Sequence, residues 1–236
     1  MRASVVIPAH NEEKNISATI RALLAQDHPD FEIIVVNNAS TDRTAEIARG
    51  FPVKVVHESR KGLLWARERG RLEATGDIVV NIDADCLPDE DWLSRGTAHF
   101  LDDEVAAVSG PYDYYDGTPS FRYISRFAQR NVYYLMNLFV QLPMIRGGAV
   151  MIGGNNFIRR AVIEKMRGYN TDLTFYGEDT DTAKRVSRHG RVIFSRSLMM
   201  KTSSRRFKDE GTLKLSIKYL FYFFKHLLMK PGRPQS

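Results

Sequence analysis

The first half of the chain alternates short apolar runs with longer segments in which apolar residues recur at helical spacing. The apolar runs predict strands at 4–7, 33–36, 53–57, 78–82 and 105–109, and the segments between them predict helices over about 11–24, 41–49 and 63–74 and after Leu87. Asn11 is the predicted N-cap of the first helix. Because the strands are apolar throughout and do not alternate, we expect them to be buried on both faces, as in a parallel sheet covered by helices.

The second half of the chain is less regular. It predicts helices over 121–141, 178–188 and 213–229, strands within 149–158 and over 192–199, and a disordered tail over 231–236. No repeat, low-complexity stretch or clear linker divides the chain. The predicted fold class is therefore α/β, with a mostly parallel sheet flanked by helices.

Polar clusters follow three of the predicted strands, and ligands of such sheets bind at the strands' carboxyl ends. The clusters are His10-Asn11-Glu12, Asn37-Asn38 and Asp83-Ala84-Asp85. Asp83 and Asp85 are two residues apart on extended backbone, so their carboxylates point to the same side and repel unless a cation lies beside them. Mg²⁺ or Mn²⁺ suits such an oxygen site, and two solvated loop carboxylates are the alternative.

The segment after the first strand, IPAHNEE, limits the kind of ligand that this end of the sheet can bind. It lacks the glycine-rich loop of a P-loop or of a dinucleotide fingerprint. Glu12 and Glu13 are expected in the first turn of the helix, where they suit the helix dipole but repel a phosphate. This loop should therefore meet the uncharged end of a nucleotide, although for Glu13 a plain helix-start role is favoured.

Two further polar segments carry candidate chemistry. Glu178-Asp179-Thr180-Asp181 begins a predicted helix, where acids are ordinary capping residues. Crowded carboxylates also raise one another's pKa, which suits a general base. The segment 201–206, KTSSRR, is either a clamp for a phosphate group or a solvated basic loop.

Composition limits the class of protein. The 236 residues carry a net charge of +6, which indicates either a solvated basic surface or attraction to phosphates. No nucleic-acid-binding signature is present, so no nucleic acid partner is expected. The single cysteine, Cys86, excludes an internal disulfide. The N-terminus lacks the apolar region of a signal peptide, and no stretch of about 18 apolar residues predicts a membrane span, so we expect a cytoplasmic protein.

Six motifs in order resemble glycosyltransferase family 2: VVIPAHNEE, VVNNASTDRT, KGLLWARERG, GDIVVNIDADC, GGNNFIRRAVIEKMRGYN and GEDTDTAKRVSRHG. The resemblance covers roughly residues 3–200, and the order and spacing of the motifs make it specific. It implies a GT-A fold, with a Rossmann-like nucleotide-binding sheet, and a metal-dependent inverting sugar transfer from a nucleoside diphosphate sugar. It also implies a catalytic domain over 1–205, with a donor half at 1–110 and an acceptor half at 111–205.

The resemblance assigns roles residue by residue. Pro8, Ala9 and Glu12 would line the nucleoside site, with Asn38 beside the base and Arg67 near the base and phosphates. Asp83 would bind ribose or sugar, Asp85 the Mn²⁺ or Mg²⁺ ion, and the loop with Asn155 and Asn156 would face the donor sugar and the acceptor. Asp179 would be the base, supported by Glu178. Apart from the resemblance, Arg205 of the segment KTSSRR is the candidate contact for a substrate phosphate.

The chain departs from the family pattern at two places. Asn37 and Asn38 stand where the family often has two aspartates, which weakens any inference about the base, although uridine is favoured. The Gln-x-x-Arg-Trp motif of processive members is absent, which disfavours polymer synthesis. The alternatives are a sugar-phosphate nucleotidyltransferase, which needs a glycine-rich loop that IPAHNEE lacks, and an inactive nucleotide-sugar-binding module, which should have lost an essential acid.

Two predicted helices carry apolar faces flanked by cations. One is the helix over 213–229, within an amphipathic helix and tail at 206–236, and the other is the helix over 121–141 with Arg122, Arg126 and Arg130. Such faces suit a lipid interface, which indicates peripheral association with the inner face of a membrane and a lipid-linked acceptor or glycan precursor. Packing on the catalytic domain, or against a second copy, is the alternative.

Overall fold

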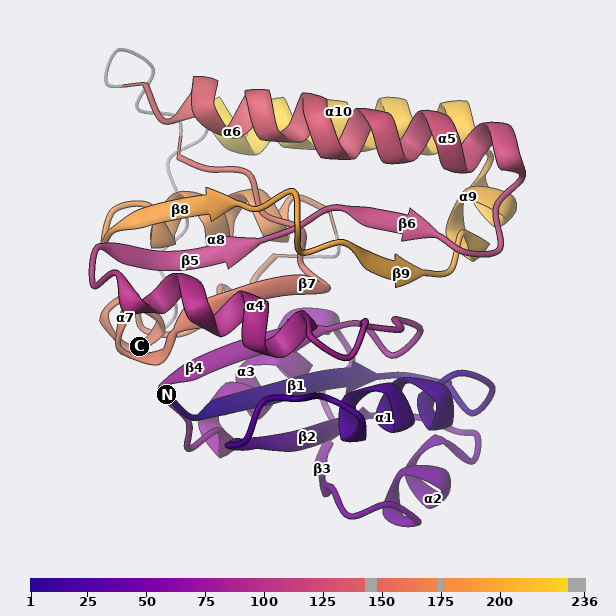
Figure 1. Ribbon diagram of the computed structural model, residues 1–236. Helices are drawn as coiled ribbons and strands as arrows, with labels where there is room; N and C mark the ends of the chain where they lie inside the picture. Colours follow the sequence, from indigo (N-terminus) through magenta and orange to yellow (C-terminus); the bar gives the residue numbers. More distant parts are fainter. Residues whose placement is uncertain (143–147, 174–175, 229–236) are drawn as a thin grey trace.

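The computed structural model describes residues 1–142, 148–173 and 176–228 (Figure 1). Among these residues, the central sheet has seven strands in the order β3-β2-β1-β4-β7-β5-β8. The strands are β1 (Ala3–Ala9), β2 (Phe31–Asn38), β3 (Lys54–Glu58), β4 (Ile78–Ile82), β5 (Val105–Ser109), β7 (Asn155–Arg159) and β8 (Arg191–Phe194). A second, two-stranded sheet pairs β6 (Tyr112–Tyr114) with β9 (Met200–Thr202).

The sheet is mostly parallel, as the continuous apolar runs predict. β7 is the exception, because it pairs antiparallel with both β4 and β5. The chain builds outward from β1 through β2 to β3, then returns to the other side of β1 with β4. The strand order therefore reverses beside β1, and in open α/β sheets such a reversal opens a crevice at the carboxyl ends of the strands.

Helices cover both faces of the sheet. On one face, α1 (Ile16–Leu24) and α4 (Trp92–Ala98) share a hydrophobic core with β1, and α2 (Thr44–Arg49) lies beside α1. On the other face lie α3 (Leu63–Glu73), α7 (Arg160–Lys165) and α8 (Glu178–Val186). Successive residues of β1, such as Val5 and Val6, belong to the two opposite cores, as a strand buried on both faces requires.

A further layer covers the end of the sheet formed by the second half of the chain (Figure 1). It contains α5 (Pro119–Phe127), the π-helical segment η2 (Ala128–Tyr133), α6 (Tyr134–Val140), α9 (Arg205–Glu210) and α10 (Thr212–Leu228). Buried Asp113 of β6 accepts hydrogen bonds from Arg122 and Arg126, which fastens α5 to the body of the protein. Side chains of α6 and α10 meet around Phe194 in a small third core.

The structure corrects the predicted start of the first helix. Asn11 is not its N-cap, because α1 begins at Ile16 and follows Asn15. Asn11 has a positive φ of 55°, and its side-chain oxygen accepts a hydrogen bond from the Thr41 N–H at 2.8 Å. Glu12 and Glu13 therefore precede the helix instead of forming its first turn. The side chain of Asn11 thus bonds to the distant Thr41 instead of capping the helix, and no local sequence pattern specifies that contact.

Other predicted elements also have different bounds. The second helix begins at Thr44 instead of 41, and the helix expected after Leu87 begins at Trp92. The strand predicted over 192–199 ends at Phe194, where the chain leaves the main sheet, and a separate strand pairs with β6 from Met200. The helix predicted over 121–141 is continuous but contains the π-helical segment η2. Residue 229 and the tail at 231–236 lie outside the described residues.

Within the described part of the chain, no helix is both long and apolar enough to cross a membrane. The last helix, α10, has only Leu215 buried, and its outward-facing apolar residues are more than half exposed. It nevertheless contacts the body of the protein, because the ammonium of Lys184 on α8 donates a hydrogen bond to the carbonyl oxygen of Leu227. The helix is thus attached along one side and open along the other.

Candidate active site

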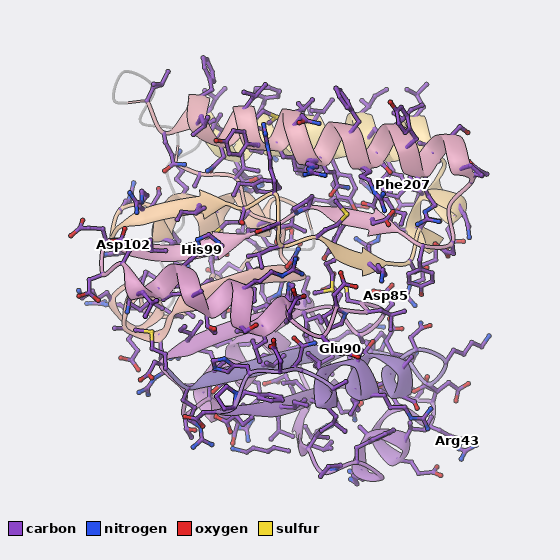
Figure 2. The ribbon with its side chains drawn as sticks, viewed as in Figure 1. Arg43, Asp85, Glu90, His99, Asp102 and Phe207 are labelled. Carbon is purple, nitrogen blue, oxygen red and sulfur yellow. The ribbon has the colours of Figure 1, made fainter. Side chains whose placement is uncertain are left out.

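A cavity of about 1150 Å³ lies at the carboxyl ends of β1, β2 and β4 and extends to side chains of η2, α6 and α10. This volume exceeds the roughly 300–1,000 Å³ of a pocket for one small molecule. The cavity lies at the strand-order reversal beside β1, so the fold places it where α/β sheets bind ligands. Figure 2 shows Asp85 between the two halves of the molecule, on the side where α9 carries Phe207.

Most of the residues predicted for the site line this cavity. They are Pro8, Ala9, Glu12, Asn38, Arg67, Asp83, Asp85, Glu178, Asp179 and Arg205. They come from loops after β1, β2 and β4, from α3, and from the first turns of α8 and α9. Asn155 and Asn156 do not line it. Asp83 and Asp179, which are almost 100 residues apart in the sequence, therefore line the same cavity.

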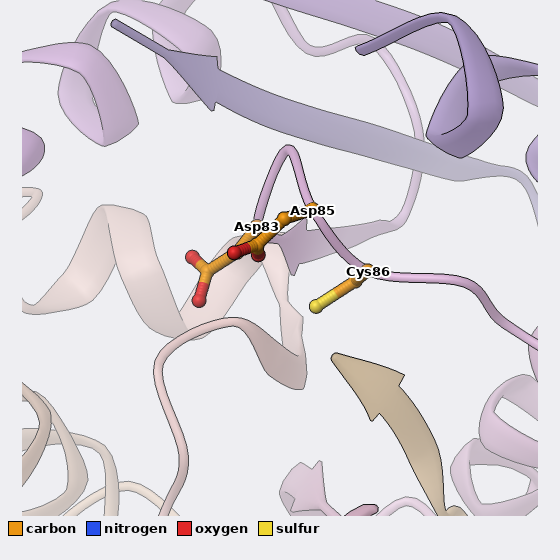
Figure 3. A group of neighbouring side chains, drawn as sticks. All are labelled: Asp83, Asp85 and Cys86. Carbon is orange, nitrogen blue, oxygen red and sulfur yellow. The ribbon is translucent and has the colours of Figure 1, made fainter. Parts of the chain in front are cut away.

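Asp83 and Asp85 follow β4, and their carboxylate oxygens lie with the Cys86 sulfur within 4.8 Å of one another (Figure 3). Burial, and then the charge of Asp83, raises the pKa of Asp85 to about 6. Burial also raises the pKa of the Cys86 thiol well above its usual value, so the thiol stays protonated and is a poor ligand. The two crowded carboxylates fit a hard divalent cation such as Mg²⁺ or Mn²⁺.

Arg67 joins this acid pair to the acids of α8. Its side chain is only 4% exposed, with one guanidinium nitrogen 3.3 Å from Asp179 Oδ1 and another 3.9 Å from Asp83 Oδ1. It therefore lies between two carboxylates, one from each half of the chain, in the wall of the cavity. A buried guanidinium requires such partners, because an unpaired buried charge is strongly destabilising.

Two glycines allow the loop before β7 to approach these carboxylates. A Cβ atom at Gly153 would lie 2.1 Å from Asp179 Oδ1, and one at Gly154 would lie 2.1 Å from Asp83 Oδ2. The Gly153 N–H donates a hydrogen bond of 2.9 Å to Asp179 Oδ2. The glycines of the GGNNF motif are thus required by close packing against both acids.

The acids of α8 have distinct surroundings. Burial, and then the charge of Asp179, raises the pKa of Glu178. Burial also raises the pKa of Asp179, although the neighbouring Arg67 guanidinium and the Gly153 N–H oppose this rise. Asp181 does not line the cavity, and its carboxylate lies 3.8 Å from the Arg185 guanidinium. Asp179 is therefore the α8 acid with both access to the cavity and hydrogen bonds that orient it.

Three asparagines predicted to contact ligands are occupied by the protein itself. Asn38 donates to the carbonyls of Glu58 and Arg60 and accepts from the Gly62 N–H, which fixes the loop before α3. The side chain of Asn155 donates to the carbonyl of Leu198 and accepts from the Trp92 indole. Asn156 donates to the carbonyls of Ile152 and Gly153 and so holds the glycine loop.

Arg205 reaches back across the cavity to the first loop. Its guanidinium donates two hydrogen bonds to the Glu12 carboxylate, one of them 2.9 Å long from Nη1 to Oε2. The same group lies 3.3 Å from Asp85 Oδ2. These contacts raise the pKa of Arg205, with the Glu12 hydrogen bonds as the largest cause. The basic segment 201–206 is thus part of the cavity wall at Arg205.

Several residues of the cavity carry no signal that the sequence analysis used. The Tyr112 hydroxyl donates to Asp83 Oδ2 at 3.0 Å, and its position follows only from the pairing of β6 with β9. From α10, the cavity is lined by Ser216, Tyr219, Leu220 and Phe223. Leu220 belongs to the predicted apolar face, whereas Ser216, Tyr219 and Phe223 follow helical spacing on a neighbouring face, so periodicity is a usable signal for them.

Comparison with known proteins adds an independent finding. The family model described as "Glycosyl transferase family 2" matches residues 4–167. The glycosyltransferase AglE of Haloferax volcanii is 30% identical over 161 residues, which are 60% of this chain and 53% of AglE. The dolichol-phosphate mannosyltransferase of Pyrococcus furiosus is 40% identical over 170 residues, 70% of this chain and 48% of that protein. The chain thus spans about half the length of these relatives.

Solved structures share the fold. The mannosyltransferase PcManGT of Pyrobaculum calidifontis, in complex with GDP-Man and Mn²⁺, superposes with a TM-score of 0.74 at 24% identity, over 98% of this chain and 65% of that one. Glucosyl-3-phosphoglycerate synthase of Mycobacterium tuberculosis, in complex with Mn²⁺, UDP-glucose and phosphoglyceric acid, gives a TM-score of 0.67 at 20% identity, over 97% and 80%. The fold class predicted from the sequence is confirmed by these neighbours.

The raised pKa of Glu178 predicts a measurable dependence of stability on pH. An acid whose pKa is raised on folding contributes stability below its unfolded value, 4.5, and that contribution is lost as the pH rises through the folded value. Glu178→Gln removes this loss. In thermal melts between about pH 5 and pH 9, the Tm of Glu178→Gln should rise relative to wild type by several degrees, since about 1 kcal/mol moves the Tm of such a chain by about 2–4 °C.

Glu90→Gln is the matched control, because it removes an exposed carboxylate outside the cavity (Figure 2). Its melting curve should stay parallel to wild type across the same range. A gap between Glu178→Gln and wild type that is constant or narrows with pH would contradict the prediction.

Proposed function

The chain belongs to glycosyltransferase family 2, and we propose that it transfers a sugar, with inversion, from a nucleoside diphosphate sugar to an acceptor hydroxyl. The observation that carries this proposal is the meeting of Asp83, Asp85 and Asp179 in one cavity with room for two substrates. In this proposal, residues 1–110 bind the donor and 111–205 bind the acceptor. The loops bearing Pro8, Ala9, Glu12 and Asn38 would line the nucleoside.

Asp85, with Asp83 beside it, would hold a Mn²⁺ or Mg²⁺ ion. The fit rests on two partly buried carboxylates whose mutual repulsion a cation relieves. Mn²⁺ in the structures of PcManGT and of glucosyl-3-phosphoglycerate synthase supports this assignment. When bound, the ion supplies Lewis-acid neutralisation of the departing diphosphate. Tyr112 and Arg67 would orient Asp83 toward the ribose or the sugar.

Asp179 would act as the general base. It accepts the proton of the acceptor hydroxyl, whose oxygen bonds to the anomeric carbon as the bond from that carbon to the diphosphate breaks. Attack from the side opposite the diphosphate gives inversion. The hydrogen bonds from Arg67 and from the Gly153 N–H orient the Asp179 carboxylate, while burial keeps it basic enough to accept a proton. Glu178 would support the acceptor from the same turn.

We favour a uridine nucleotide as the donor carrier on the family resemblance alone, because the side chain of Asn38 is held by the backbone of Glu58, Arg60 and Gly62. The two structural neighbours carry different nucleotides, since one complex contains GDP-Man and the other UDP-glucose. Arg205 would contact the diphosphate, for which its forked guanidinium is suited.

The acceptor, in this proposal, is lipid-linked or a glycan precursor at the inner face of a membrane. The exposed apolar residues gather on two helical segments that meet around the same small core, α5 through α6 and α10. They are Tyr123, Ile124, Phe127, Leu135, Leu138 and Phe139 on the first and Leu213, Ile217, Leu220, Phe221, Phe224 and Leu228 on the second. Exposed apolar residues that gather in this way mark a surface for a membrane or for another protein. Arg122 and Arg126 pair with Asp113, so fewer cations flank it than the sequence suggested.

Metal and donor dependence test the core of the proposal. With Mn²⁺ and a panel of UDP-, GDP- and TDP-sugars, we expect release of nucleoside diphosphate, fastest from a UDP-sugar, and loss of turnover on adding chelator. Asp85→Ala should abolish Mn²⁺-dependent donor binding while the fold is retained. Cys86→Ser, a neighbour in the same cluster, should bind Mn²⁺ as wild type does. Full activity in excess chelator, or release of pyrophosphate, would contradict the proposal.

The base is tested by a pair of isosteric variants. Asp179→Asn should bind donor nearly as tightly as wild type and lose about 10²–10⁴-fold in kcat, the usual contribution of a positioned base. Asp181→Asn is the control, since Asp181 faces Arg185 and does not line the cavity. Rates are to be normalised to the folded fraction. An active Asp179→Asn beside an inactive Asp181→Asn would reverse the assignment.

Membrane association is tested by flotation with anionic phospholipid vesicles. The wild-type chain should rise with the vesicles, and the double variant Phe221→Glu/Phe224→Glu should stay at the bottom with an unchanged Tm, because both side chains are more than half exposed. Leu101→Glu replaces an exposed leucine on a different face and should float like wild type. A wild-type chain that stays at the bottom would contradict membrane association and would favour a protein partner for the apolar faces.

A further inference from the structure

We propose that Arg205 is an exchangeable counter-ion of Asp85, which a divalent cation must displace and which then binds the diphosphate of the donor. The inference rests on the proposed function and deepens it. It assigns to one side chain two successive partners, a carboxylate and a phosphate. It also predicts that the metal and the nucleotide bind more tightly together than either does alone.

The charges around Asp85 require a cation. Asp83, Asp85 and Glu12 all line the same side of the cavity, and the side chains of Asp85 and Glu12 are only 10% exposed. Carboxylates so close and so poorly hydrated destabilise one another. The Arg205 guanidinium meets both Glu12 and Asp85, and it therefore compensates the charge that a metal ion would otherwise compensate.

A metal ion and Arg205 compete for one oxygen. Arg205 Nη2 lies 3.3 Å from Asp85 Oδ2, whereas the Thr202 hydroxyl donates to the other oxygen, Oδ1, at 3.4 Å. A Mg²⁺ ion binds carboxylate oxygen at about 2.0–2.1 Å. An ion at Oδ2 would thus lie within a few ångströms of the guanidinium, where two cations repel strongly at the low dielectric of a partly buried site.

The side chain of Arg205 is free to move while its backbone is not. Its side chain is 48% exposed, so rotation into the cavity meets little obstruction. The preceding backbone is fixed by Asp116, whose carboxylate accepts from the Ser203 hydroxyl at 2.9 Å and from the Ser204 N–H. Arg67 offers the contrast, because it is 4% exposed between two acids and has no room to leave them.

Displacement prepares Arg205 for its second partner. A guanidinium released from Asp85 keeps its planar fork of N–H donors, which matches two oxygens of a phosphate. The diphosphate that arrives with the metal offers those oxygens in the same part of the cavity. Linkage then requires that the diphosphate raise the affinity for the metal, and the metal the affinity for the diphosphate, by the same factor.

Binding of Mn²⁺ alone, followed by the electron paramagnetic resonance of the free ion, tests the inference on the full-length chain. Arg205→Gln should bind Mn²⁺ at least about tenfold more tightly than wild type without nucleotide, a change of about 1.4 kcal/mol. With Mn²⁺ saturating, the same variant should bind nucleoside diphosphate roughly tenfold more weakly, because a charge-assisted phosphate contact is lost. The opposite signs of the two changes identify an exchangeable ligand.

Two further variants make the test specific. Lys201→Gln removes the same charge from a residue of the same basic segment that pairs with Asp89 outside the cavity, and it should leave the affinity for Mn²⁺ alone unchanged. Arg205→Lys keeps the charge and should bind Mn²⁺ nearly as weakly as wild type. Thermal melts establish that each variant is folded. The Lys variant also keeps the inference testable if Arg205→Gln unfolds, because tight Mn²⁺ binding by Arg205→Lys would count against competition by charge.

Two negative outcomes are distinguishable. Equal Mn²⁺ affinities for wild type and Arg205→Gln, with nucleotide-dependent Mn²⁺ binding intact, would overturn the role of Arg205 and leave the proposed function standing. Absence of Mn²⁺ binding in wild type and in every variant, with and without nucleoside diphosphate, would overturn both.

Discussion

The arrangement of the site depends on one buried guanidinium. Arg67 of α3 lies between Asp83, which follows β4, and Asp179, which lies in the first turn of α8. Removing both acids would leave the buried guanidinium with an unpaired charge, which is strongly destabilising. Arg67 thus ties the first half of the chain to the second.

The remaining features of the site accommodate this ion pair. The loop before β7 can reach both acids only because Gly153 and Gly154 have no side chains. Asn156 holds that loop through the carbonyls of Ile152 and Gly153, and the Gly153 N–H donates to Asp179. Arg67 is a buried counter-ion of Asp83 and Asp179, whereas Arg205 is a half-exposed counter-ion of Glu12 and Asp85. The proposed exchange of partners by Arg205 depends on this difference in exposure.

The helix α10 contributes side chains both to the cavity and to the exposed surface. Tyr219 and Phe223 of α10 line the cavity, whereas Phe221 and Phe224 face outward. The sequence predicts an amphipathic helix here, with packing on the catalytic domain and lipid contact as alternatives. In the structure, one side of this helix lines the cavity and contacts α8, and the other side is exposed.

The sequence by itself determined the α/β class, the order of the strands along the chain and the polar strand ends that line the cavity, because continuous apolar runs and polar strand ends are local signals. It did not determine the partner of Asn11, the end of the predicted 192–199 strand at Phe194, or the contacts of Arg67, Arg205 and Tyr112. Each of these depends on which segments, distant in sequence, are brought together. Pairing energies between such segments decide them, and no local pattern encodes those energies.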